Sequence, residues 1–236
     1  GAGSEDRANR AAGQVFGLLL ILSLTMGLVG FLGSNWILTA VVGAPAEVVP
    51  MATSYLKIVF AGLPFMFGYI AFNFLLRGVG DMKRPMYILG IGVILNVILD
   101  PFLILGIGPF PRLAVTGAAI ATVLTRAVSS AIGIYLLFSG KTDLNLSLGD
   151  LKPDFGWIKK IFDIGLPTAI ARGGSSLGFV VIMALVTEFG TVPVTAYGIG
   201  QRVLQTVNIV VWGFAGAALT MVGQNIGAEQ KERAEE

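Results

Sequence analysis

The sequence places an asparagine and an aspartate four positions apart inside an apolar segment. The stretch NVILD, residues 96–100, lies within a run of about twenty otherwise apolar residues, the length of a membrane span. A carboxylate in hydrocarbon costs about 2.5–3.5 kcal/mol, so it should face a protein interior or a wet cavity and have a function. Asn96 lies one helical turn from Asp100 and can hydrogen-bond its carboxylate or help it to hold an ion.

Because burial disfavours the charged form of a carboxyl group, Asp100 is suited to reversible protonation. The pair Asp100 and Asn96 can alternatively contribute oxygen ligands to a sodium ion. The sequence thus predicts a coupling site for H⁺ or Na⁺, with no other cofactor. The competing interpretation is a static brace, in which Asp100 pairs with a buried arginine such as Arg126 or Arg172.

Most catalytic chemistry is excluded by composition. The chain has no cysteine and no histidine, which removes thiolate nucleophiles, imidazole bases and the usual zinc ligands. The glycines of GIGVIL and GIGPF are not followed by a phosphate-binding Gly-Lys-Ser/Thr motif, so ATP use is not supported. We therefore expect neither an enzyme nor a nucleic-acid-binding protein.

The elements that position these residues are predicted to be transmembrane helices. The chain is 55% hydrophobic and 13% charged, whereas an ordinary soluble domain has about 25% charged residues. Apolar runs long enough to cross a bilayer predict an all-α integral membrane protein with six spans. These lie near 15–42, 51–76, 85–106, 115–138, 162–187 and 193–222.

The basic residues predict the orientation of the spans, because Lys and Arg favour cytoplasmic loops. Most of them fall at the two ends or in alternate loops, and the opposite loops hold only Arg112. Both ends, and the polar linker at 141–160, should therefore be cytoplasmic in a multi-pass protein of the plasma (inner) membrane. The basic residues of the cytoplasmic set are Arg7, Arg10, Arg77, Lys83, Arg84, Lys141, Lys152, Lys159, Lys160, Lys231 and Arg233.

Several helices contain an interior proline, which removes a backbone hydrogen bond and favours a kink. These prolines, Pro64, Pro101 and Pro167, suit a protein that must change shape. A second group of residues could line a substrate cavity, since aromatic rings and methionine accommodate amphipathic cations. The candidates are Phe65, Met66, Tyr69, Ser129 and Arg172.

The two ends of the chain resemble each other. Aligning GAGSEDRANR, residues 1–10, with GAEQKERAEE, residues 227–236, matches four positions identically. We interpret this as one period of an internal repeat, so that the chain is a fragment of a protein with two six-helix halves. The matched pairs are Gly1 with Gly227, Ala2 with Ala228, Arg7 with Arg233, and Ala8 with Ala234.

Motifs along nearly the whole chain resemble the multidrug and toxic compound extrusion (MATE) transporters. They are LRGVGDMKRPMY, NVILDPFLILGIGPFPRLAVTGAAIAT, IGLPTAI, AYGIGQRV and GQNIGAEQKERA. The resemblance implies helices three to eight of a twelve-helix, two-lobe transporter. Residues 1–140 would be the last four helices of the amino-terminal lobe, 141–161 the cytoplasmic linker, and 162–236 the first two helices of the carboxy-terminal lobe with the loop that follows.

The resemblance also implies a function and site residues. Family members exchange organic cations and other amphipathic drugs for protons or sodium, so the expected partners are such compounds, the lipid bilayer and the remaining helices of the parent chain. Asn96 and Asp100 match the amino-lobe coupling site of many prokaryotic members, and Thr122 matches a threonine of that network. The partner aspartate that the resemblance implies on the first helix lies outside this chain, so the site here would be incomplete. Some members instead use an acidic residue on the seventh helix, but that span here has only Asp163 and Glu188, near its ends, which favours an amino-lobe site.

Two other functions remain open at this point. A lipid-linked oligosaccharide flippase of the same superfamily should line its cavity with basic residues, for which Arg126, Arg172 and Arg202 are candidates. A non-transporting membrane scaffold subunit would leave Asp100 without a role.

Overall fold

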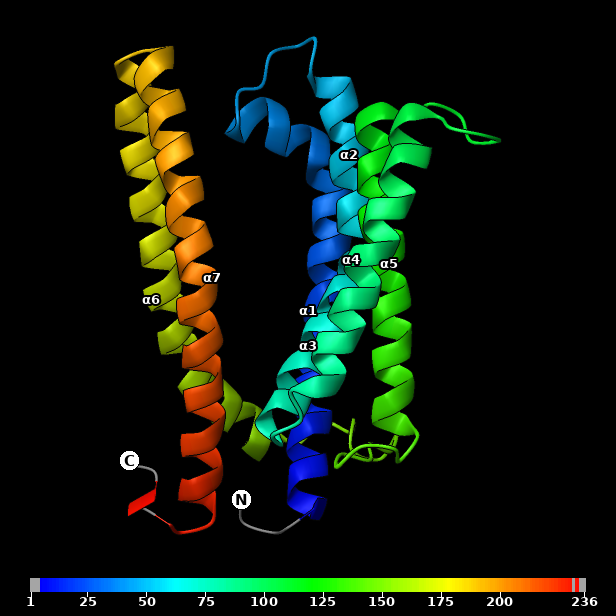
Figure 1. Cartoon of the computed structure of the whole chain (residues 1–236), viewed down its shortest axis with the longest axis vertical. Helices are drawn as coiled ribbons and strands as arrows, with labels where there is room; N and C mark the ends of the chain where they lie inside the picture. Colours follow the sequence, from blue (N-terminus) through cyan, green and yellow to red (C-terminus); the bar gives the residue numbers. More distant parts are fainter. Residues whose placement is uncertain (1–4, 231, 234–236) are drawn as a thin grey trace. The chain divides into compact units, whose positions relative to one another are not determined.

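The computed structural model describes residues 5–230 and 232–233, and within them the chain is helical, with no strand (Figure 1). The prediction of an all-α protein is confirmed. The elements in chain order are α1 (Glu5–Trp36), a π-helical turn η1 (Ile37–Val41), α2 (Val49–Ala61), α3 (Leu63–Gly78), α4 (Lys83–Leu105), α5 (Ala114–Phe138), α6 (Phe155–Glu188) and α7 (Thr191–Gly227).

The predicted number of spans is confirmed once α2 and α3 are counted as one. Among the described residues, five helices are long and apolar enough to cross a membrane, and α2 and α3, bent by 46° at their junction, make a sixth when they are taken as one span. The bend follows from the sequence at the junction. Gly62 separates the two helices, and Pro64 is in the first turn of α3. A backbone N–H at that position has no partner within the helix, so proline, which lacks the N–H, is tolerated there.

Two helices begin earlier than the apolar runs predicted. α1 begins at Glu5, and its first turns consist of polar residues that lie before the apolar run predicted near 15–42. α6 begins at Phe155 because Asp154 caps its amino terminus, accepting hydrogen bonds from the backbone N–H of Gly156 at 3.0 Å and Trp157 at 3.4 Å. Hydropathy alone does not detect a helix that extends beyond the hydrocarbon.

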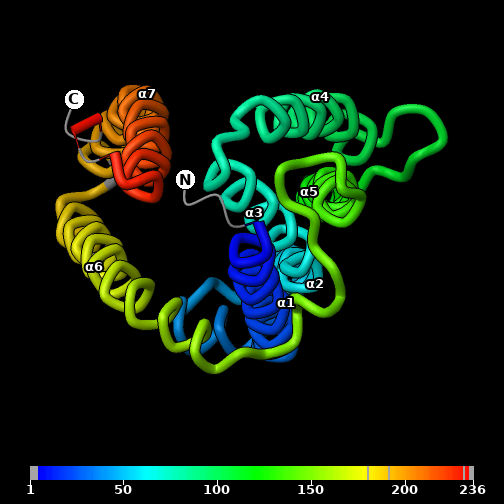
Figure 2. The backbone as a smooth tube through the Cα atoms, turned by 90° about the horizontal axis from the view of Figure 1, so that it is seen from below, coloured from blue at the N-terminus to red at the C-terminus, as the bar shows by residue number. Residues whose placement is uncertain are grey.

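The described chain divides into two compact units between Pro153 and Asp154. In the first, α5 packs against α2, α3 and α4, while α1 packs against α2 and α3 (Figure 2). Its largest buried side chains include Phe72, Leu76 and Leu137, which join α3 to α5. This arrangement brings α4 and α5 side by side and antiparallel, so residues from the two helices can share a site.

The polar segment after α5 belongs to the first unit. Leu144 and Leu146 are buried in the same core as Ala12 and Phe16 of α1. Gln14, itself only 3% exposed, donates from its side-chain nitrogen to the backbone oxygens of Asp150 and Lys152, each at 2.7 Å. Residues 140–153 therefore form a strap packed on α1.

The second unit is the hairpin of α6 and α7. Its helices contact each other through Phe179 and Tyr197, whose ring centroids are 6.2 Å apart, and through Arg172 and Trp212. No described residue of either helix is buried within the unit. Such apolar and exposed helices need lipid or further helices as partners.

The internal repeat rests partly on residues that are outside the described part. Gly1, Ala2 and Ala234 lie there, so the structure does not describe three of the four matched pairs in full. Arg7 lies in the first turns of α1, and Gly227 is the last residue of α7.

Candidate functional site

Asp100 and Asn96 lie on one face of α4 and contact each other. The side-chain nitrogen of Asn96 donates to Asp100 Oδ1 at 3.5 Å, and both side chains are partly buried. The helix begins where Asp81 accepts hydrogen bonds from the backbone N–H of Lys83 and Arg84, both at 3.1 Å. From that start, α4 runs far enough to place Asp100 inside its apolar length.

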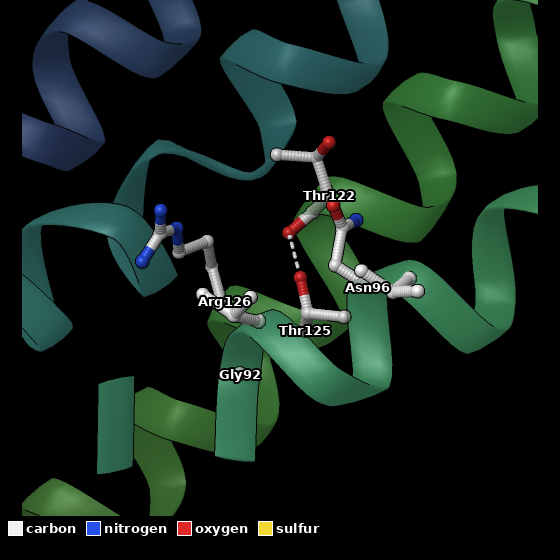
Figure 3. A pocket seen from close by; sticks show the side chains of 7 residues that line it. Gly92, Asn96, Thr122, Thr125 and Arg126 are labelled. Atoms are coloured by element: carbon white, nitrogen blue, oxygen red, sulfur yellow. Dashed lines mark hydrogen bonds between the residues drawn. The ribbon is translucent and has the colours of Figure 1, made fainter. Parts of the chain in front are cut away.

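A small cavity of about 100 Å³ opens between α4 and α5 beside this pair. Asn96 and Thr122, both predicted from the sequence, lie in its wall, whereas Asp100 is not among its lining residues. Figure 3 shows Asn96, Thr122 and Thr125 grouped together, with the hydroxyl of Thr125 donating to the backbone oxygen of Thr122 at 2.9 Å. The lining residues are Gly92, Val93, Asn96, Val97, Thr122, Thr125 and Arg126.

Close packing of α4 on α5 sets the width of the cavity. A Cβ atom on Gly92 would lie 2.8 Å from Ser129 Oγ, and one on Gly117 would collide with the backbone carbonyl of Leu103. Small residues at these two contacts let the helices approach closely on either side of Asn96. Between these two close contacts, Asn96 of α4 faces Thr122 and Thr125 of α5, and the cavity lies at this position.

Arg126 is a lining residue that the sequence did not assign to the coupling site. Its guanidinium carbon lies 4.8 Å from the centroid of the Tyr69 ring, a cation–π contact between α5 and α3. Arg172 makes a similar contact with Trp212, also at 4.8 Å. Among the described residues of its unit, Arg126 forms no ion pair with Asp100, so its contacts do not support a static brace between these two residues.

The residues predicted to line a substrate cavity are dispersed. Tyr69 contacts Arg126, a residue that lines the α4–α5 cavity, but is not itself a lining residue. The Phe65 side chain is 45% exposed, and Met66 is partly buried. Ser129 is fully buried against Gly92 and is absent from the lining of the cavity. Arg172 belongs to the other unit.

The three prolines occupy different positions. Pro64 follows the bend between α2 and α3, whereas Pro101 and Pro167 lie inside the unbroken helices α4 and α6. Pro101 is adjacent to Asp100 and has no N–H, so the carbonyl of Val97, a lining residue, lacks its usual helical donor.

Within residues 5–230 and 232–233, no group of three or more acidic side chains is placed so that it could hold a metal ion. A sodium ion at the candidate site would take its protein ligands from the Asp100 carboxylate, the Asn96 amide oxygen and neighbouring hydroxyl or carbonyl oxygens. The donor set fits a single hard cation or a proton better than a transition metal.

Comparison with known proteins identifies the family to which the chain belongs. The family model MatE matches residues 1–102 and 167–236. The chain is 33% identical to a FAD transporter of Shewanella oneidensis, over 92% of the chain and 49% of the relative. It is 29% identical to the probable multidrug resistance protein YoeA of Bacillus subtilis, over 99% of the chain and 51% of the relative.

A solved structure agrees. An outward-facing multidrug resistance MATE family transporter of the MOP superfamily matches with a TM-score of 0.86 at 26% identity, covering 98% of this chain and 51% of that one. The chain thus spans about half the length of the curated relatives it matches. By the family match, the identity to its relatives and the shared helical architecture, this chain is a multi-pass membrane protein of the MatE family of transporters.

Proposed function

We propose that the chain is part of a secondary active efflux antiporter, which exchanges organic cations or other amphipathic compounds for protons or sodium ions. The observation that carries the proposal is a carboxylate inside a membrane-spanning helix whose observed partner is a neutral amide, Asn96. An intramembrane carboxylate is costly and by default functional. A proton or a sodium ion would remove that cost by neutralising it.

Asp100 is the residue that would bind the coupling ion, with Asn96 and Thr122 as its neighbours. Ion binding would remove a charge from α4 directly beside Pro101, where the helix already lacks one backbone hydrogen bond. A helix weakened at this point can bend or repack at low cost when the charge changes. That movement would alter the contact of α4 with α5 and so link ion binding to release of substrate.

The remaining features of the proposal concern the whole transporter. The chain would supply helices three to eight of two lobes, with both of its ends and the 140–153 strap on the cytoplasmic side of the plasma membrane. The distribution of Lys and Arg supports this orientation. The missing helices would complete the lobes and cover the exposed faces of α6 and α7.

The substrate class is proposed from the family and the site together. One relative is named a multidrug resistance protein and another a FAD transporter, so relatives with similar sequences carry names from different substrate classes. A flippase cavity should be lined by several basic residues, but Arg126 is the basic residue that lines the described cavity. We therefore favour amphipathic organic substrates over lipid-linked oligosaccharides.

The test is efflux of a fluorescent organic cation from vesicles that contain the full-length protein, under separate proton and sodium gradients. Wild type should export the dye under one gradient, and Asp100→Asn, which keeps the size of the side chain, should lose gradient-driven export. Asp143→Asn, an exposed carboxylate in the strap, is the matched control and should export normally. Equal export by Asp100→Asn and wild type would refute the coupling role.

A further inference from the structure

Arg126 carries a positive charge in the middle of the membrane-spanning helix α5. The helix runs from Ala114 to Phe138 and is long and apolar enough to cross a membrane. An arginine at the centre of a span costs about 2.5–3.5 kcal/mol on insertion scales and normally has a partner or lines a wet cavity. Here it lines the α4–α5 cavity.

The contacts of Arg126 leave its charge uncompensated within the described part of the chain. The guanidinium rests on the ring of Tyr69, a contact that orients the group but adds no negative charge. Asp100, the carboxylate of the adjoining helix α4, accepts a hydrogen bond from Asn96 and forms no ion pair with Arg126 among the described residues. Figure 3 shows the guanidinium extended away from Asn96 and the two threonines.

The lining of the cavity suits an anionic group. The lining has no carboxylate among the described residues, and Arg126 is the lining residue that carries a charge, with its guanidinium on the Tyr69 side, away from Asn96 and Thr122. The Thr125 hydroxyl already donates to the backbone of Thr122. Guanidinium groups bind carboxylate and phosphate by paired, charge-assisted hydrogen bonds.

The cavity is small and partly open. At about 100 Å³ it is large enough to admit one carboxylate or phosphate group. A pocket for a whole drug-sized molecule is usually about 300–1,000 Å³. The cavity is therefore the size of a subsite for one polar group of a larger molecule.

We propose that Arg126, held by Tyr69, forms an anion subsite that receives the acidic group of an amphipathic substrate, so that the transporter also exports carboxylate- or phosphate-bearing compounds. This rests on the proposed function, because the substrate must first be carried by the antiporter. Asn96 lines the same cavity as Arg126 and donates to Asp100, so one cavity carries both the subsite and a neighbour of the coupling residue.

The test compares two dyes that differ only in the acidic group, a rhodamine with a free carboxylate and the ethyl ester of the same rhodamine. Full-length protein is placed in vesicles of phosphatidylcholine alone, so that no anionic lipid supplies the acidic group. Arg126→Gln should lower export of the free acid about tenfold or more, the effect of losing a charge-assisted hydrogen bond, and leave export of the ester within about twofold. Arg126→Lys should fall between Arg126→Gln and wild type.

Two further variants separate the subsite from general effects. Tyr69→Leu removes the ring beneath the guanidinium and should reproduce the selective loss of free-acid export, whereas Tyr69→Phe keeps the ring and should lose less of it. Lys57→Gln is the matched control, because Lys57 lies 5.6 Å from the Phe31 ring in the same unit but does not line the cavity. It should change export of neither dye.

The proposal is overturned if Arg126→Gln lowers export of both dyes equally or of neither. Failure of the proposed function has a different signature, in which the wild-type protein exports neither dye. Fluorescence polarisation of the free-acid dye with purified protein then decides the subsite. Binding that is lost in Arg126→Gln supports it, and equal binding overturns it.

Discussion

The side-chain amide of Gln14 donates a hydrogen bond of 2.7 Å to the backbone carbonyl oxygen of Asp150, a residue 136 positions further along the chain. The same nitrogen donates to Lys152, and the backbone N–H of Asn145 donates to Asn9 Oδ1 at 3.0 Å. The strap of residues 140–153 is therefore held along the first turns of α1. A segment that looks like a flexible linker in the sequence is part of a packed unit.

This contact predicts different effects for two glycine substitutions in α1. A Cβ atom on Gly13 would collide with Asp150, whereas one on Gly17 would lie 3.7 Å from the nearest atom, the Leu151 oxygen. Gly13→Ala should destabilise the protein by about 1–3 kcal/mol through overpacking, despite the higher helix propensity of alanine. Gly17→Ala should be neutral or stabilising by up to about 1 kcal/mol.

Thermal unfolding in detergent, together with proteolysis of the strap, measures this difference. Faster cleavage within residues 140–153 is expected only for Gly13→Ala. If the two variants unfold and are cleaved alike, the strap is not packed on α1 as described.

The α4–α5 contact predicts a coupling between Gly92 and Ser129. Ser129 Oγ is buried, has no hydrogen-bond partner in the described chain, and lies where a Cβ on Gly92 would go. Gly92→Ala should destabilise by about 1–3 kcal/mol, and Ser129→Ala should be neutral or stabilising, since it removes an unsatisfied hydroxyl. In the double variant, Ser129→Ala should restore about 1 kcal/mol or more.

Unfolding of the four variants in a double-mutant cycle measures that coupling. Gly90→Ala is the control, because a Cβ at Gly90 meets nothing within 4 Å. Strictly additive effects of Gly92→Ala and Ser129→Ala would mean that the two residues are not in contact.

Much of the fold was predictable because hydropathy and loop punctuation report directly on membrane spans. The number of spans followed from apolar runs, with α2 and α3 counted as one. The starts of α1 and α6 were not predicted, because α1 begins with polar residues and the first turns of α6 are interrupted by Lys159 and Lys160, so neither start lies in a continuous apolar run. The cap provided by Asp154 was the local signal for α6, since an Asp before a helical stretch marks an amino terminus.

The site residues that could be predicted are polar side chains in an otherwise apolar stretch of sequence. Asp100 and Asn96 stood out as polar groups in an apolar run, and the structure places them in contact. Arg126 was noticed as a charge, but its contact with Tyr69 depends on how α5 packs against α3, which no local pattern encodes. For the same reason the burial of Ser129 against Gly92 could not be predicted from spacing.

Asn96 should tune ion affinity without being indispensable. Asn96→Ala removes the hydrogen bond that Asn96 donates to the Asp100 carboxylate, so proton binding should strengthen about fivefold, corresponding to about 1 kcal/mol, whereas sodium binding should weaken because the amide oxygen is lost as a ligand. The dependence of efflux rate on pH or sodium concentration measures the shift. Ile98 is an exposed neighbour on α4, so Ile98→Ala should leave the dependence of efflux on pH or sodium unchanged. If Asn96→Ala also leaves it unchanged, Asn96 does not belong to the ion site.

Pro101 should control the rate of the conformational step. Pro101→Ala restores a donor for the Val97 carbonyl and should stabilise a continuous α4 by up to about 3 kcal/mol. We expect a higher unfolding temperature and a lower maximal efflux rate, with the same ion dependence as wild type. Pro111→Ala, in the loop between α4 and α5, should keep the wild-type rate. Wild-type turnover in Pro101→Ala would show that the helix does not need this weak point.

The most direct test of the central claim is to measure ion displacement by substrate on the purified full-length protein. A rhodamine ester is added to protein in weakly buffered detergent solution, and the released protons, or released radioactive sodium, are counted for wild type and Asp100→Asn. Exchange at Asp100 predicts that wild type releases one of these ions on dye binding and that Asp100→Asn binds the dye but releases neither. Equal release by the two proteins would contradict the assignment of Asp100 as the coupling residue.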